Sequence, residues 1–157
     1  MAGEAGKVLT RLLNCSIAWE TMIASDHNHV TREHHGGREL WVHRKGAMSA
    51  QQGEPGVLPG SMGSSSFHVE GRGCVEALCS SAHGAGRAWS RGAARGRFTD
   101  RDLQRQMEGV WYDYRLTGKL RDEAPAAYKD IHKVLKAQRE LVKVTRTLRP
   151  VLNYKGI

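Results

Sequence analysis

The sequence lacks the long apolar runs that a membrane-spanning helix requires. Such a helix takes roughly 20 consecutive apolar residues, and no stretch of the 157-residue chain approaches that length. Residues 1–24 are mildly apolar, but Arg11 and Glu20 interrupt them and no small-residue cleavage signal follows. We therefore expect neither a membrane segment nor a signal peptide.

Cysteine is also scarce. The chain has three cysteines, Cys15, Cys74 and Cys79, and no two of them form a CxxC pair. We interpret this odd number of isolated cysteines as free thiols in a reducing compartment, which predicts a cytoplasmic protein.

Two common nucleotide-binding motifs are missing, the phosphate loop GxxxxGK[ST] and the dinucleotide fingerprint GxGxxG. Glycine itself is plentiful, with 18 residues, which predicts many tight turns and sites lined by backbone. Three segments stand out: residues 59–66 (PGSMGSSS), residues 83–87 (HGAGR) and the terminal Lys155-Gly156. Backbone N–H groups in such segments can close around a phosphate. A tight turn without a ligand is the alternative interpretation.

Charge divides the chain into two unlike halves. The formal net charge is −1 over residues 1–82 and +9 over residues 83–157. Seven of the eight histidines fall in the first 83 residues. The basic half makes a polyanion such as RNA a plausible partner, although a basic face can also be merely solvated.

The pattern of residues predicts strands and loops in the first half and helices in the second. Residues 7–24 could end a helix or a strand. The first half is expected to hold a strand at 40–42, a loop over 53–66, a strand at 66–70 and a helix start at 74–79. The second half is expected to hold helices at 87–94, at 100–107 behind the N-cap Thr99 with Asp102 as a capping box, and from Pro125 to Leu148, followed by an extended segment at 151–154.

His83 is the candidate nucleophile. Histidine has an ordinary pKa of roughly 6.5, so a neutral imidazole can attack the α-phosphorus of a nucleotide near pH 7. Backbone N–H groups of residues 84–86 would face the developing charge, and a helix starting after Gly86 would add its positive end. Arg87 and Arg91 would then share one helix face and hold phosphates. From the residues alone, a turn histidine without chemistry remains open.

The segment His27-Asn28-His29 is a second candidate site. In an extended chain His27 and His29 point to the same face and could share a metal ion. Glu33, His34 and His35 follow closely, and two histidines with one carboxylate suit a divalent transition metal. An exposed histidine-rich loop is the alternative.

These motifs occur in an order that resembles one family. The pattern is HN at 27–28 with Val30 and Arg32-Glu33, RKGA at 44–47, PGSMGSSSF at 59–67, HGAGR at 83–87, AYKDI at 127–131 and a terminal KG. It is similar to that of RtcB, the tRNA-splicing RNA ligase, over nearly everything after about residue 25. The combination of PGSMG, HGAGR and the terminal KG is highly specific.

The resemblance implies an α+β fold with several sheets. It also implies a GTP- and Mn²⁺-dependent ligase that joins an RNA 3′-phosphate or 2′,3′-cyclic phosphate to a 5′-hydroxyl. His83 matches the guanylylated histidine, His27 a Mn²⁺ ligand, and Asn28 a residue beside the nucleotide. The segments that match the wrapping around GMP are Pro59, Gly60, Ser61 and Met62, and Gly84, Ala85 and Gly86. Ser66, Tyr128 and Lys155 match groups that hold guanine, and Lys45, Arg87 and Arg91 match residues that engage RNA phosphates.

The chain departs from the family in length. RtcB proteins are much longer, so we expect residues 1–157 to be the C-terminal guanylate-binding portion, with the N-terminal half and most Mn²⁺ ligands supplied elsewhere or by a partner chain. His29 replaces a common tyrosine and Asp26 a histidine or small residue, which puts the metal site in doubt. The alternatives are a non-catalytic RNA- or nucleotide-binding remnant and, more remotely, a metal-dependent hydrolase.

Overall fold

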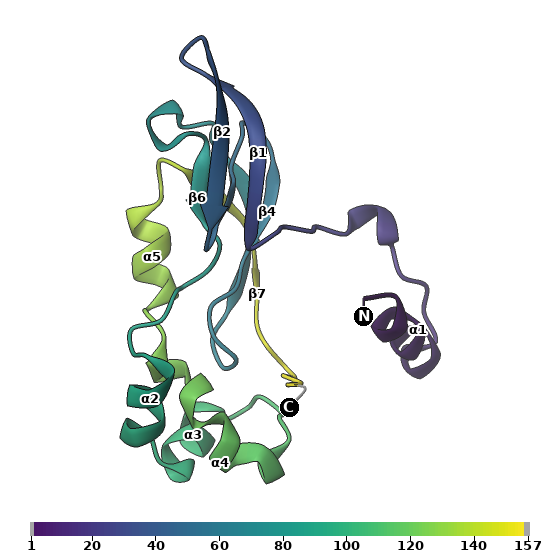
Figure 1. Ribbon diagram of the computed structural model, residues 1–157. Coiled ribbons are helices and arrows are strands. Elements are labelled where there is room, and N and C mark those ends of the chain that lie inside the picture. Colours follow the sequence, from purple (N-terminus) through teal and green to yellow (C-terminus); the bar gives the residue numbers. More distant parts are fainter. Residues whose placement is uncertain (1, 156–157) are drawn as a thin grey trace.

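The computed structural model describes residues 2–155 and gathers small sheets at one end of the molecule and short helices at the other (Figure 1). The mixture of helices and strands confirms the expected α+β class. The helices are α1 (Ala2–Leu13), α2 (Arg91–Arg97), α3 (Asp100–Gln106), α4 (Thr117–Leu120) and α5 (Ile131–Ala137). No helix in this described part is long and apolar enough to cross a membrane.

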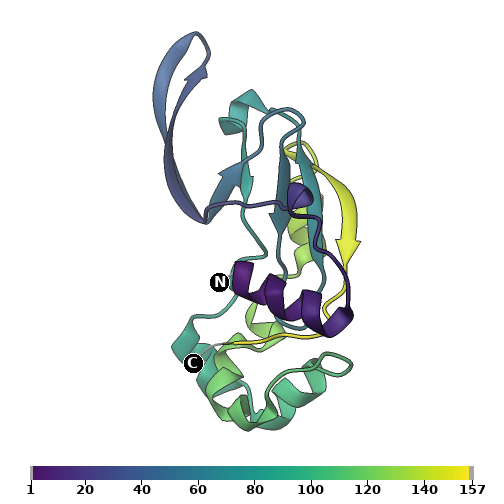
Figure 2. The same cartoon turned by 90° about the vertical axis from the view of Figure 1, so that its right-hand side faces the viewer.

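The strands form three antiparallel sheets. Strands β1 (Asn28–His35) and β2 (Arg38–Lys45) make a hairpin, which extends away from the body in Figure 2. Strands β3 (Ala47–Ser49) and β6 (Ser80–Ala82) pair as a short ribbon. Strands β4 (Pro55–Leu58), β5 (Ser66–Gly71) and β7 (Val142–Leu148) form the third sheet in the order β4-β5-β7. Helix α1 stands apart from this body in Figure 1.

Two separate apolar clusters hold the body together. The first lies between the sheets and α5 and contains Met48, Ala50, Leu58, Phe67, Val69, Ala85, Ile131 and Val142. The second lies among the helices and contains Met62, Leu103, Met107, Tyr112, Leu120 and Ala124. The loop after β4 connects the two clusters, because Leu58 is buried in the first and Met62 in the second. This double anchoring fixes the path of residues 59–61 between them.

Several predicted elements are confirmed where local signals are strong. Thr99 caps α3, and its side chain and that of Asp102 form the reciprocal hydrogen bonds of a capping box. The alternating segment 66–70 is strand β5, with Phe67 and Val69 buried. The strand predicted at 40–42 lies within β2, and all three cysteines are free thiols.

The long helix predicted from Pro125 to Leu148 is wrong. The structure instead has a 3-10 turn (Pro125–Ala127), the short helix α5 and the strand β7. Asp130 caps α5 by accepting a hydrogen bond from the backbone N–H of His132 at 2.9 Å. The β-branched run from Val142 onward then pairs with β5, so its apolar residues belong to an edge strand and not to a helix face.

Three other predictions need correction. The loop predicted at 53–66 contains β4, in which Pro55 occupies the first strand position and leaves pairing with β5 intact. The segment 74–79 is a 3-10 turn (Val75–Ala77) that leads into β6. Helix α2 begins at Arg91, with Ser90 as its N-cap, and not at Arg87. The positive end of a helix therefore does not lie at Gly86.

Candidate functional site

An open pocket of about 350 Å³ lies where the sheets meet the helices, and we call it the His83 pocket. Loops and turns form most of its wall, which is lined by His27, Gly46, Pro59, Gly60, His83, Gly84, Ala85, Gly86, Arg87 and Tyr128. Nine of these ten positions are candidate site residues from the sequence, and Gly46 is the exception. The fold therefore brings together segments that are up to 101 residues apart in the chain, from His27 to Tyr128.

Gly46 joins the two histidines of this pocket through its backbone. Its N–H donates to the His27 carbonyl at 2.9 Å, and its carbonyl accepts from the His83 N–H at 3.0 Å. The two imidazole rings lie edge to face with centroids 5.3 Å apart. Asn28 fixes the His27 ring, because its Oδ1 accepts from His27 Nδ1 at 2.9 Å. His27 Nε2 is then the nitrogen with a free lone pair.

The glycine-rich loop after β6 exposes backbone donors to the pocket. Ala85 is buried in the first cluster and donates its N–H to the Pro59 carbonyl at 3.0 Å, which ties the two loops together. Among the described residues, the N–H groups of Gly84 and Gly86 donate to no protein acceptor. Gly86 has a φ of +69°, a conformation that favours glycine. Free N–H groups in such a loop suit an anion.

Tyr128 and Arg87 form the side of the pocket nearest the helices. The Arg87 guanidinium lies over the Tyr128 ring, 4.9 Å from its centroid, and its Nη1 donates to Tyr128 Oη at 3.2 Å. Backbone hydrogen bonds from Lys129 N–H to the Gly86 carbonyl (2.9 Å) and from Ala88 N–H to the Ala127 carbonyl (2.9 Å) hold the two segments side by side. One face of the ring is thus occupied by a cation, and a base would have to stack on the other.

Two buried carboxylates, Asp122 and Glu123, lie behind this wall. Arg91 Nη1 donates to Asp122 Oδ2 at 2.8 Å and to Glu123 Oε1 at 2.5 Å. Tyr128 Oη donates to Glu123 Oε2 at 2.5 Å, and Lys155 Nζ lies 3.5 Å from the same oxygen. Arg91 is therefore already paired within the protein. Lys155 is connected to the His83 pocket only indirectly, because Glu123 contacts both Lys155 and Tyr128.

The ionisation of these groups follows from their surroundings. Burial by itself would raise the pKa of Glu123, but the Tyr128 hydroxyl, Lys155 and Arg91 outweigh it and leave the pKa below its ordinary value. Burial, together with the hydrogen bond to Glu123, raises the pKa of Tyr128 to about 12. At neutral pH Glu123 is therefore a carboxylate, and the Tyr128 phenol keeps the proton that it donates.

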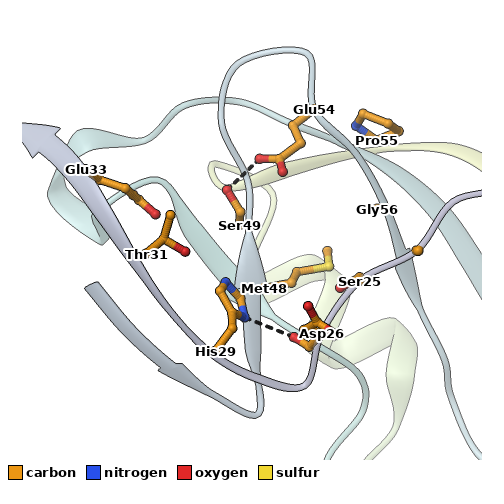
Figure 3. Close-up of a pocket in the computed structure, with 11 residues that line it drawn as sticks. Ser25, Asp26, His29, Thr31, Glu33, Met48, Ser49, Glu54, Pro55 and Gly56 are labelled. Carbon is orange, nitrogen blue, oxygen red and sulfur yellow. Dashed lines mark hydrogen bonds between the residues drawn. The ribbon is translucent and has the colours of Figure 1, made fainter. Parts of the chain in front are cut away.

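A second pocket, of about 260 Å³, contains His29, and we call it the His29 pocket. Figure 3 shows Asp26, Glu33 and Glu54 around it, with Ser49 donating to Glu54 at 2.5 Å and His29 Nδ1 lying 3.2 Å from the Asp26 carbonyl oxygen. Ser25 lines this pocket, and its carbonyl lies 3.3 Å from Nε2 of His83. The segment 24–26 thus separates the two pockets.

The donor set for a metal ion is incomplete in this portion. Within residues 2–155, no group of three or more His, Cys, Asp and Glu side chains is placed to hold a metal ion. His27 and His29 do not share one site, because His27 lines the His83 pocket and His29 the other pocket. His35 is buried against Glu33, and Arg44 also binds that carboxylate. The described residues by themselves therefore do not fit a Mn²⁺ ion.

Several residues selected from the sequence lie outside the pocket wall. Met62 is a core residue of the helical cluster, and Ser61 bonds to Ser64, Oγ to Oγ, at 2.8 Å. Ser66 is the first residue of β5, opposite Leu148. Lys45 ends β2 with an exposed side chain. Gly156, the last residue of the terminal KG motif, lies outside the described residues.

Comparison with known proteins assigns this architecture. The family described as tRNA-splicing ligase RtcB matches residues 1–156. The chain belongs to the RtcB family. The RNA-splicing ligase RtcB of Escherichia coli K12 is 48% identical over 130 residues, covering 83% of this chain and 31% of that protein. The tRNA-splicing ligase RtcB of Pyrobaculum aerophilum is 34% identical over 154 residues, covering 85% and 32%. The chain thus spans about a third of the length of the curated RtcB relatives that it matches.

Two features of the His83 pocket and its surroundings were not predicted from the sequence. Gly46 was seen within the RKGA motif, but its role between His27 and His83 depends on pairing that no local pattern reveals. Asp122 and Glu123 were not selected at all. Their signal was available, since two adjacent acids in a strongly basic half are candidates for internal ion pairs.

Proposed function

We propose that this chain is the guanylate-binding portion of a GTP-dependent RNA ligase, with His83 as the residue that becomes guanylylated. The observation that carries the proposal is the convergence of His83, the free N–H groups of Gly84 and Gly86, Arg87 and the Tyr128 ring on one pocket. Membership of the RtcB family supports ligation of RNA as the overall reaction.

In the proposed step a neutral ring nitrogen of His83 attacks the α-phosphorus of GTP. A phosphorus–nitrogen bond forms, the bond from that phosphorus to the bridging oxygen breaks, and pyrophosphate leaves with its electron pair. The N–H groups of Gly84 and Gly86 are suited to the phosphate oxygens, where negative charge increases in the transition state. Arg87 adds a fixed cation beside them.

The guanine would lie toward Tyr128. Tyr128 lines the pocket, and its ring would provide the surface on which the base stacks. Lys155, held 3.5 Å from Glu123, would reach the base. Ser66 lies in the β4-β5-β7 sheet and does not line the His83 pocket, so no contact with the nucleotide is assigned to it.

We propose that this chain supplies only part of a Mn²⁺ site. A divalent cation would neutralise phosphate charge when bound. His27 would contribute one ligand through its free Nε2, and the remaining ligands would come from parts of an RtcB ligase that have no counterpart among the described residues. We assign no step to the metal.

RNA with a 3′-phosphate or 2′,3′-cyclic phosphate and a 5′-hydroxyl is the proposed substrate of the complete ligase. The net charge of +9 over residues 83–157 supports contact with a polyanion. Arg91 and Arg87 are largely committed to Asp122 and Glu123, so Lys45, which is exposed beside Gly46, is the freer cation for an RNA phosphate.

Incubation with GTP labelled at the α-phosphate, in the presence of Mn²⁺, tests the proposal. The chain is expected to acquire a covalent label that the His83→Ala variant does not acquire. His34→Ala is the matched control, because His34 is an exposed residue of the hairpin and lines neither pocket. GMP affinity, measured by calorimetry on the same variants, separates binding from covalent transfer.

The outcomes distinguish the alternatives. A label that persists in His83→Ala contradicts the assignment of the nucleophile. GMP binding without any label in the wild-type chain would instead identify a nucleotide-binding portion that does not react by itself. Neither binding nor label would reject the proposed function for this chain.

A further inference from the structure

Glu123 contacts several of the residues that are proposed to bind the nucleotide or phosphate. Its Oε2 accepts from Tyr128 Oη at 2.5 Å and lies 3.5 Å from Lys155 Nζ. Its Oε1 accepts from Arg91 Nη1 at 2.5 Å and lies 3.5 Å from Arg87 Nη1. The residue is 8% exposed. One buried carboxylate thus touches four side chains that were selected as binding groups.

The neighbouring Asp122 provides a natural comparison. It is also buried, at 2% exposed, and also accepts from Arg91, at 2.8 Å. Its second side-chain partner is Arg95 at 3.2 Å, on the side of α2. In the described contacts its carboxylate does not reach Tyr128 or Lys155. Of the two carboxylates, only Glu123 therefore contacts side chains in the wall of the His83 pocket.

The contacts restrict the Tyr128 ring from two directions. Glu123 fixes its hydroxyl, and the Arg87 guanidinium covers one face. Arg87 in turn donates to the backbone carbonyls of Trp89 and Asp122. A ring held in this way loses little conformational freedom when a base stacks on it, so more of the stacking energy remains for binding.

We propose that Glu123 is a positioning residue of the His83 pocket, which fixes the Tyr128 ring and the Arg87 guanidinium for nucleotide binding and holds Lys155 beside them. The inference rests on the proposed guanylate binding. Glu123 acts through its neighbours and does not line the pocket itself. The raised pKa of Tyr128 agrees with a phenol that donates to this carboxylate.

The test compares Glu123→Gln with Asp122→Asn in the full 157-residue chain. Both substitutions are nearly isosteric and remove one buried charge from the same cluster. GMP affinity is expected to fall roughly tenfold in Glu123→Gln, because the amide carries no charge and offers one acceptor oxygen where the carboxylate offers two, and to change much less in Asp122→Asn. Combining Glu123→Gln with Tyr128→Phe should weaken binding no further than the stronger single variant, since the first weakens and the second removes the same hydrogen bond.

A second measurement needs no ligand. In NMR spectra of chain with ¹³C-labelled tyrosine, the ring signals of Tyr128 are identified by their absence in Tyr128→Phe. They should move in Glu123→Gln and stay nearly unchanged in Asp122→Asn. If Glu123→Gln fails to fold, Tyr128→Phe removes the same hydrogen bond from the other side and should lower GMP affinity by a similar factor.

The outcomes separate this inference from the proposed function. A wild-type chain that does not bind GMP rejects the proposed function and the role of Glu123 in binding, while the ring signals still report whether Glu123 holds Tyr128. A wild-type chain that binds GMP, together with unchanged affinity or unchanged Tyr128 signals in Glu123→Gln, overturns the positioning role alone. Additive losses in the double variant would also overturn it.

Discussion

The His83 pocket and the His29 pocket lie on either side of the segment 24–26, yet they are built from opposite chemistry. Glycine backbone, Arg87 and Tyr128 surround His83, whereas Asp26, Glu33 and Glu54 surround His29. In the first pocket the lining residues Gly84 and Gly86 leave their N–H groups without a protein acceptor. In the second the carboxylates are already used inside the protein, Glu33 by Arg44 and Glu54 by Ser49.

This difference shows how the same neighbourhood can hold a binding surface and a structural polar cluster. A ligand requires donors or acceptors that the protein leaves unsatisfied, and the described part of the chain leaves the N–H groups of Gly84 and Gly86 in that state. Near His29, Glu33 instead pairs with Arg44, which also donates to the Leu78 carbonyl and so connects the hairpin to the body. Substitutions in the His29 pocket should therefore lower stability more than GMP affinity. Substitutions in the His83 pocket should lower GMP affinity more than those in the His29 pocket.

The largest effect on stability is expected from Glu33→Gln in the His29 pocket. Arg44 is 3% exposed and donates to both oxygens of Glu33. Weakening a buried ion pair by removing one charge should lower the free energy of unfolding by roughly 3 kcal/mol, measured by urea denaturation. GMP affinity of the folded variant should not change. A loss of GMP affinity without a loss of stability would show that the His29 pocket contributes to nucleotide binding and not to the stability of the fold.

The same pair predicts a pH dependence. Arg44 is the main cause that holds the pKa of Glu33 below its ordinary value. A carboxylate with a lowered pKa in the folded state stabilises the fold above its ordinary pKa, and this contribution is lost as the pH falls through the folded value. The difference in unfolding free energy between wild type and Glu33→Gln should thus be constant from pH 6 to 8, about two to four pH units above the ordinary glutamate pKa of about 4.3, and shrink in acid.

Glycine substitutions should give the next largest contrast. A Cβ at Gly60, in the His83 pocket, would lie 2.5 Å from the Ser65 carbonyl oxygen, whereas one at Gly56, in the His29 pocket, would lie 2.9 Å from the end of the Met48 side chain. Backbone cannot yield as a flexible methionine can. Gly60→Ala should cost about 2 kcal/mol and most GMP affinity, and Gly56→Ala about 1 kcal/mol with affinity retained. Equal costs would show that the Gly60 loop is not rigid.

Arg87→Met should affect binding more than stability. It removes the guanidinium beside the free N–H groups of the His83 pocket, and the expected loss of GMP affinity is about tenfold, or roughly 1.4 kcal/mol. Glu54→Gln, in the His29 pocket, is the control and should leave affinity unchanged. Calorimetry at matched salt measures both variants. A stronger effect from Glu54→Gln would indicate that the nucleotide binds in the His29 pocket and not in the His83 pocket.

The smallest effect is expected on the hairpin surface. Arg32 and Glu39 form an ion pair with side chains that are 60% and 40% exposed. Arg32→Gln should change the free energy of unfolding by less than about 1 kcal/mol and leave GMP affinity unaltered. A large loss of stability would mean that the hairpin contributes more to the fold than its exposure indicates.

Local signals predicted the parts of the fold that neighbouring residues decide. The capping box of Thr99 and Asp102 spans four residues, and the alternation of β5 spans six, so both could be found from the sequence. Strand β7 was mistaken for a helix because its spacing also fits a helical period. Its pairing with β5, more than 70 residues earlier in the chain, decides its conformation.

By itself the sequence determined which residues are chemically able to take part: a nucleophilic His83, glycine loops before and after it, the ring of Tyr128 and a basic second half. Only the tertiary structure decided which of them meet. Gly46 bonds to both His27 and His83, and Glu123 contacts both Tyr128 and Lys155. Met62 is buried in the core. The physical reason is that burial and hydrogen bonding between distant segments depend on the packing of two separate apolar clusters, which no local pattern records.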